Sequence, residues 1–142
     1  MKIFDCFMFY DEEFLLDIKM NILNEYVDYF VIVESKYFHN GKKRELKFDI
    51  NKYSEFKNKI IYIIQNEQPE NLKLLNPSDN EGLKSFKLIF NAHLREHYQR
   101  NCIAKGLKAS DENDIILISD VDEIPDLKNI NIKNIKNKII LF

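Results

Sequence analysis

Several stretches of this chain are apolar without interruption, and this property limits its possible folds more than any other. Residues 29–33 read Tyr-Phe-Val-Ile-Val, and residues 115–118 read Ile-Ile-Leu-Ile. A strand with one face in water alternates apolar and polar side chains, whereas a strand covered on both faces is apolar throughout. We therefore expect a largely parallel sheet with helices on both of its faces.

The segments between these runs have helical spacing. Asp11 is expected to cap a helix that reaches about residue 24, a short helix is expected at 51–57, and Ser85 is expected to cap a long helix to about residue 107. Residues 65–82 are expected to be a long irregular excursion. Strands are predicted at 3–9, 29–34, 60–64, 115–119 and 138–142, with the strand 115–119 at the centre of the sheet.

Length and composition fit one α/β domain over residues 1–142. The chain has 142 residues, of which 45% are hydrophobic, and its net charge is −2. This charge gives no basic field for nucleic acid, and the N-terminus shows neither a signal peptide nor a transmembrane span. Cys6 and Cys102 lie in apolar surroundings, which indicates reduced thiols and a cytoplasmic protein. The chain stops on its last apolar strand, which suggests a truncated domain.

The strongest chemical signal follows the apolar run 115–118. Asp120 and Asp122 are two residues apart, so in an extended segment their side chains would project to the same side. Ligands of open α/β sheets bind just beyond the carboxyl ends of such strands, and hard oxygen ligands suit Mg²⁺ or Mn²⁺. The sequence therefore predicts a divalent metal site, with an acidic loop of no function as the ordinary alternative.

Four blocks of sequence resemble one known family. They are FDCF at residues 4–7, VDYFVIVES at 27–35, REHYQRN at 95–101 and ISDVDEIP at 118–125. Together, in this order and over nearly the whole chain, they resemble glycosyltransferase family 17, the β-1,4-mannosyl-glycoprotein β-1,4-N-acetylglucosaminyltransferases. The resemblance implies a GT-A-like, three-layer fold that binds a nucleotide-diphospho-sugar, of which this chain would be the part that binds the sugar donor. It also implies inverting transfer, from UDP-N-acetylglucosamine, to a glycan acceptor.

The resemblance also suggests roles for individual residues. Asp122 would be the direct metal ligand, and Asp120 would support it or reach the ribose of the nucleotide. Glu34, at a strand end, would contact the base or ribose. Arg100 and Asn101 would lie near the diphosphate, for which a guanidinium is well suited. The ordinary alternatives are a surface carboxylate at Glu34 and a helix-surface ion pair at Arg100.

The general base of the reaction has no strong candidate. Inverting transfer requires a group that takes the proton of the acceptor hydroxyl. Glu123 and Asp126 are weak candidates because of their position at the end of the metal motif and just after it, although Asp126 is better explained as a cap for the segment that follows it. We therefore also consider a catalytically silent or partial GT-A domain, which binds a nucleotide-sugar or a partner chain without turnover.

Overall fold

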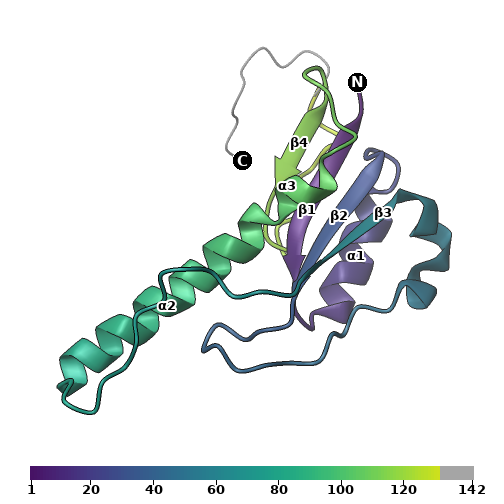
Figure 1. The fold of residues 1–142 in the computed structure, drawn as a ribbon. Helices are drawn as coiled ribbons and strands as arrows, with labels where there is room; N and C mark the ends of the chain where they lie inside the picture. The colour runs from purple at the N-terminus through teal and green to yellow at the C-terminus, as the bar shows by residue number, and fades with distance from the viewer. Residues whose placement is uncertain (132–142) are drawn as a thin grey trace.

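A four-stranded, all-parallel sheet forms the centre of the molecule. The computed structural model describes residues 1–131. Its strands lie in the order β3-β2-β1-β4 (Figure 1), and their bounds are Ile3–Phe9 for β1, Tyr29–Ser35 for β2, Ile60–Gln65 for β3 and Ile115–Ile118 for β4. All three strand pairs are parallel. The α/β class and the parallel sheet predicted from the sequence are confirmed.

Helices cover both faces of the sheet, as Figure 1 shows. The helix α1, Glu13–Leu23, and the 3₁₀ segment η1, Ile50–Lys59, pack on one face, whereas the short helix α3, Ile103–Gly106, packs on the other. The long helix α2, Glu81–Asn101, approaches the α3 face by its C-terminal end. Within residues 1–131, no helix combines the length and apolar character needed to cross a bilayer.

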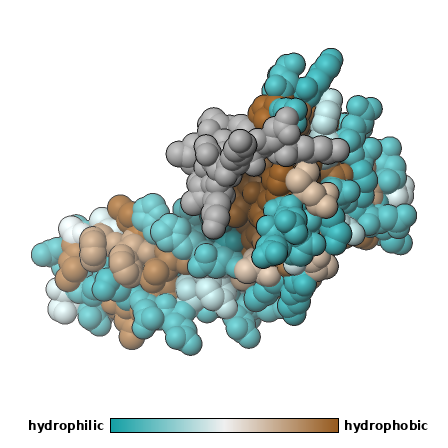
Figure 2. Space-filling model, turned by 90° about the horizontal axis from the view of Figure 1, so that it is seen from above, coloured by the Kyte–Doolittle hydropathy of each residue, from teal (hydrophilic) through white to brown (hydrophobic). Residues whose placement is uncertain are grey.

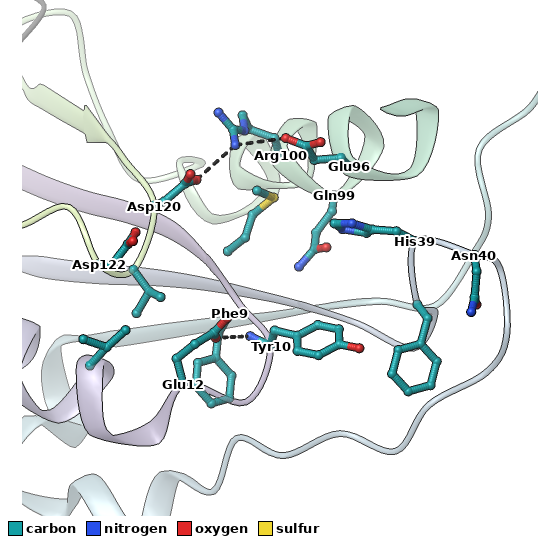
Figure 3. Close-up of a pocket in the computed structure, with 14 residues that line it drawn as sticks. Phe9, Tyr10, Glu12, His39, Asn40, Glu96, Gln99, Arg100, Asp120 and Asp122 are labelled. Carbon is teal, nitrogen blue, oxygen red and sulfur yellow. Dashed lines mark hydrogen bonds and ion pairs between the residues drawn. The ribbon is translucent and has the colours of Figure 1, made fainter. Parts of the chain in front are cut away.

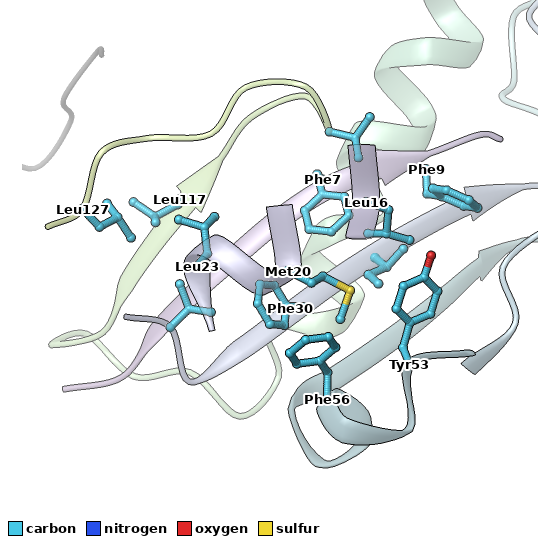
Figure 4. Packing of buried hydrophobic residues seen from close by; sticks show 13 residues of the cluster. Phe7, Phe9, Leu16, Met20, Leu23, Phe30, Tyr53, Phe56, Leu117 and Leu127 are labelled. Carbon is cyan, nitrogen blue, oxygen red and sulfur yellow. The ribbon is translucent and has the colours of Figure 1, made fainter. Parts of the chain in front are cut away.

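Each face of the sheet has its own hydrophobic core. Successive strand residues point to opposite faces, so Phe7 and Phe30 pack under α1, whereas Phe4 and Val31 pack under α3. Figure 4 shows the larger core, where these strand side chains contact Leu16, Met20 and Leu23 of α1. Because both faces are buried, β1 and β2 need apolar residues at successive positions, which explains the uninterrupted apolar run of β2 and the run of β1, which only Asp5 interrupts.

The strand β4 lies at one edge of the sheet within residues 1–131, so the predicted central position of this strand is wrong for this part of the chain. Ile118, at the end of β4, is 57% exposed. The interior strands of this sheet are β1 and β2, because the chain runs outward from β1 through β2 to β3 and then returns to the other side of β1. This return creates a topological switch point between β1 and β4, where ligands of open α/β sheets bind. The predicted strand 138–142 lies outside the described residues.

Two helix starts differ from the sequence prediction. Glu12 rather than Asp11 occupies the N-cap of α1, and its carboxylate accepts hydrogen bonds from the N–H groups of Tyr10 and Asp11. Asn80 caps α2, with its side chain accepting from Leu83 N at 2.8 Å, so this helix begins one turn before Ser85. The Asn80 side chain thereby satisfies an N–H group that has no partner within α2, whereas the Glu12 side chain makes no hydrogen bond to the first turn of α1.

The N-terminal half of α2 projects away from the sheet as an arm (Figure 1). The segment 66–80 is irregular, which confirms the excursion predicted at about 65–82. It runs along this arm and is tied to it by two hydrogen bonds of 2.8 Å between the Asn91 side chain and the backbone of Lys73. Figure 2 shows apolar side chains exposed on this arm, which include Phe86 and Ile89. The C-terminal part of α2, at the other end of the helix, lines a pocket beside the sheet.

Candidate active site

A pocket of about 710 Å³ lies at the switch point between β1 and β4. Its walls come from the end of β1, the start of α1, the loop after β2, the C-terminal part of α2 and the turn after β4 (Figure 3). The polar and aromatic side chains that line it are Phe9, Tyr10, Glu12, Phe38, His39, Asn40, Glu96, Gln99, Arg100, Asp120 and Asp122. The pocket therefore collects segments that are far apart in the sequence.

The acidic turn, residues 119–123, forms one wall of this pocket. Asp120 and Asp122 both line it, as the sequence predicted, but they lie on a turn rather than on an extended strand. Glu123 N donates to Asp120 O at 3.1 Å, and Asp120 N donates to the Glu123 carboxylate at 2.9 Å. Both aspartates are exposed, so their carboxylates are open to a ligand from the pocket.

A buried lysine lies beneath the acidic turn. Lys19 of α1 is fully buried, and its ammonium donates to Ser119 Oγ at 2.8 Å, to Asp120 O at 3.2 Å and to Glu123 O at 2.6 Å. The carboxylate of Asp5, in β1, lies 3.7 Å from Lys19 Nζ and forms an ion pair with it.

Burial has the largest effect on the pKa values of Asp5 and Lys19. It raises the pKa of Asp5 to about 6, although the nearby ammonium of Lys19 opposes that change. It also lowers the pKa of Lys19, against the attraction of Asp5, Glu123 and Asp120. Neither charge would be stable in this core without the other and without the oxygens of the turn.

Arg100 joins the long helix to the acidic turn. Its guanidinium lies 3.0 Å from the Asp120 carboxylate and 3.5 Å from that of Glu96. The family resemblance suggested that Arg100 lies near a diphosphate, and its side chain forms part of the pocket wall (Figure 3). Asn101 is exposed and does not line the pocket.

Glu34 does not line the pocket, and its carboxylate is fully buried. It accepts hydrogen bonds from Lys47 N at 2.7 Å, Phe48 N at 3.1 Å and Tyr62 Oη at 2.6 Å, and it pairs with Arg44 at 3.1 Å. Burial, together with this carboxylate, raises the pKa of Tyr62. In this structure the contacts of Glu34 therefore hold the loop 36–49 against the sheet.

The wall opposite the acidic turn is aromatic. The rings of Tyr10 and Phe38 lie 5.7 Å apart, and the Arg44 guanidinium lies 4.2 Å from the centre of the Tyr10 ring. Arg95 fixes the same loop by donating to the carbonyl of His39 at 2.9 Å. The pocket thus has a flat apolar side and a carboxylate side, a combination suited to a ligand with both a ring and a charged part.

Several pocket residues have no counterpart in the sequence prediction. Tyr10, Glu12 and Glu96 line the pocket, and Lys19 supports it from below. For Lys19 a signal was present, because it lies three residues after Leu16 on the apolar side of its helix, where a lysine needs a buried partner. The other three depend on how the loops fold back over the sheet.

The two weak candidates for the general base lie outside the pocket lining. The Glu123 carboxylate accepts from Asp120 N, and the Asp126 carboxylate accepts from the side chain of Asn129 at 2.6 Å. Both carboxylates are therefore engaged in local contacts of the turns in which they lie.

Two carboxylates of the acidic turn fit a divalent ion of the Mg²⁺ type. Within residues 1–131, no three His, Cys, Asp or Glu side chains gather closely enough to hold a metal by themselves. Mg²⁺ is commonly held by one or two protein carboxylates, with phosphate and water oxygens as the other ligands. The exposed oxygens of Asp120 and Asp122 therefore match a metal that arrives with a phosphorylated ligand.

Comparison with known proteins gives one match. No curated protein and no solved structure matches the chain. The family "Glycosyltransferase family 17" matches residues 1–139, which include β1, β2, the C-terminal part of α2 and the acidic turn. This match covers nearly the whole chain, as the four sequence blocks led us to expect. The chain therefore belongs to glycosyltransferase family 17.

Proposed function

We propose that this chain binds a nucleotide-diphospho-sugar, UDP-N-acetylglucosamine, together with Mn²⁺ or Mg²⁺, and transfers the sugar with inversion to a glycan acceptor. Membership of a glycosyltransferase family supports the reaction class. The observation that carries the rest is the position of Asp120 and Asp122, which face a pocket of about 710 Å³ at the carboxyl ends of β1 and β4. This is where an open α/β sheet binds its ligand, and the fold is compatible with a GT-A-like domain.

In this proposal the two ends of the pocket hold different parts of the sugar donor. Asp122, supported by Asp120, would hold the metal ion, which when bound neutralises charge on the leaving diphosphate. Arg100 would turn from Asp120 toward a phosphate oxygen, since a guanidinium pairs with either anion. The aromatic wall formed by Tyr10 and Phe38 would face the base and ribose.

A second candidate function is binding without turnover. Glu123 and Asp126, the residues considered as general base, are engaged in local turns outside the pocket. Without a base the chain would retain the sugar donor but transfer sugar slowly, as a partial or silent domain. This alternative shares the metal and nucleotide site with the first proposal and differs only in catalysis.

Calorimetric titration tests the shared site. We expect UDP to bind wild-type protein more tightly with Mn²⁺ than with EDTA. Asp122→Asn should abolish this metal-dependent gain, and Asp120→Asn should weaken it. Asp17→Asn, the same change at an exposed position of α1, should leave the affinity as in wild type. Unchanged metal-dependent binding in Asp122→Asn would contradict the metal assignment.

Release of UDP from UDP-N-acetylglucosamine separates the two functions. With a β-mannosyl glycan as acceptor, a transferase releases UDP in proportion to the sugar added, whereas a silent domain binds the nucleotide-sugar without releasing UDP. Binding with no release above the protein-free control would favour the silent domain.

A further inference from the structure

One side chain holds the acidic turn from below at several points. The Lys19 ammonium bonds Ser119 Oγ, Asp120 O and Glu123 O, so its contacts extend over the whole of residues 119–123. We propose that Lys19 is a positioning residue, whose ammonium fixes the acidic turn in the conformation that presents Asp120 and Asp122 to the pocket. The ligand named in this inference rests on the proposed function, whereas the ordering of the turn does not.

The burial of Lys19 supports a dedicated role. An ammonium has three N–H donors, and each can be assigned to one oxygen of the turn. An apolar side chain would pack at this position beside Met20 and Leu23 without the cost of burying a charge. The positive charge is therefore explained by the groups that it contacts. Its three hydrogen bonds all go to the acidic turn, and within residues 1–131 the ammonium also pairs with Asp5 and lies 5.1 Å from the centre of the Phe7 ring.

The atoms that Lys19 contacts explain how a positively charged side chain can support a site for a metal cation. Lys19 contacts the main-chain oxygen of Asp120 and leaves the carboxylate of that residue free to face the pocket. The Asp5 carboxylate, 3.7 Å away, compensates the positive charge of the ammonium. Lys19 thus orders the backbone that carries both carboxylates without occupying their oxygens. Groups that orient metal ligands in this way affect affinity strongly although they do not touch the metal.

A charge-balanced double variant separates positioning from folding. Lys19→Met alone would leave the Asp5 carboxylate buried without its partner, and Asp5→Asn alone would leave the ammonium so, and either variant can fail to fold. The comparison is therefore between wild-type protein, which has the three bonds from Lys19, and Asp5→Asn/Lys19→Met, which removes them together with both charges. Lys59→Met is the matched control, because it makes the same substitution at a lysine that bonds main-chain oxygens away from the acidic turn. Lys59 donates to Asn24 O at 2.6 Å and to Val27 O at 3.0 Å, just after the C-terminus of α1.

Amide hydrogen exchange tests the ordering of the turn. In Asp5→Asn/Lys19→Met we expect faster exchange of residues 119–123 than in wild-type protein, with the strands β1 and β2 protected in both. Lys59→Met should accelerate exchange near residues 24–27 and leave the acidic turn unchanged. Equal protection of residues 119–123 in wild-type protein and the double variant would overturn the inference.

Titration of UDP with Mn²⁺ tests the consequence for the site. The metal-dependent affinity should fall about 10- to 100-fold from wild-type protein to the double variant, the range found when supporting partners of metal ligands are removed. The affinity measured with EDTA should not change, which a general loss of structure would not produce. An unchanged metal-dependent affinity would overturn the positioning role. If wild-type protein bound no UDP, the proposed function would fail, whereas hydrogen exchange would still decide whether Lys19 orders the turn.

Discussion

At the scale of single residues, Gly106 shows how closely α3 lies on the sheet. A Cβ atom at this position would lie 2.5 Å from Val31 Cγ1, and Val31 is fully buried in β2. We expect Gly106→Ala to push α3 from the sheet and to lower the free energy of unfolding by about 1–3 kcal/mol, the usual cost of overpacking. Denaturant titration measures this change.

Gly82→Ala is the matched control for Gly106→Ala. A Cβ atom at Gly82 would meet nothing closer than 3.5 Å, where it would contact Asn80 Oδ1. Alanine favours a helix over glycine by about 1 kcal/mol, so this change in the first turn of α2 should be neutral or stabilising. Equal free energies of unfolding for Gly106→Ala and wild type would contradict the close packing described above.

Individual functional residues were predictable only where their neighbours in the sequence define them. Asp120 and Asp122 follow an apolar strand directly, so the sequence placed them at a strand end, and both line the pocket. The environment of Glu34 depends on the loop 36–49, which has no periodic pattern from which its path could be inferred. The role of Lys19 was not predicted, because lysine is abundant in this chain. Only its position on the apolar side of α1 distinguishes Lys19 from the other lysines.

At the scale of elements, the loop 36–49 is fixed by a buried ion pair. Glu34 is fully buried and the side chain of Arg44 is 4% exposed. Glu34→Gln would leave the guanidinium without its counter-charge, and removal of one partner of a buried pair costs about 3–5 kcal/mol. We therefore expect a large loss in the free energy of unfolding, together with faster proteolysis within residues 36–49.

The same variant distinguishes a structural from a binding role of Glu34. A residue that contacts only the ligand would, when changed to Gln, lower the affinity for UDP and leave stability as it was. Glu81→Gln is the control, since Glu81 forms an exposed pair with Lys84 and the change should not measurably alter stability. A stable Glu34→Gln variant with weakened UDP binding would favour the base and ribose contact predicted from the sequence.

The type of each element, helix or strand, was predictable in this chain because burial of the sheet on two faces leaves a clear sequence pattern. The exact ends of the elements and the order of the strands in the sheet were not predictable. The strands β2 and β3 each end one residue beyond their predicted bounds. The start of α2 was missed by one turn because Asn80 and Ser85 are both good caps, and only the path of the preceding segment selects Asn80. The position of β4 beside β1 depends on a crossover, which apolar runs do not encode.

At the scale of the whole molecule, the return of the chain to β4 brings the pocket together. The turn after β4, the end of β1 and the loop after β2 meet there, and the C-terminal part of α2 lies across them (Figure 3). These segments are distant in the sequence, so a ligand that contacts all of them stabilises the folded molecule as a unit. Binding to the folded state alone raises its stability by mass action.

We expect UDP with Mn²⁺ to raise the midpoint of thermal unfolding, and EDTA to reverse this rise. At a UDP concentration of 100 times Kd, the gain in the free energy of unfolding is about 2.7 kcal/mol. Asp122→Asn should show no metal-dependent rise, because its side chain would no longer hold the ion at the pocket wall. Hydrogen exchange should slow together at residues 8–12, 38–40 and 120–122, which line the pocket from three parts of the chain. Protection confined to one of these segments would show that UDP binds elsewhere, since a ligand in a pocket formed at the switch point must contact its opposite walls.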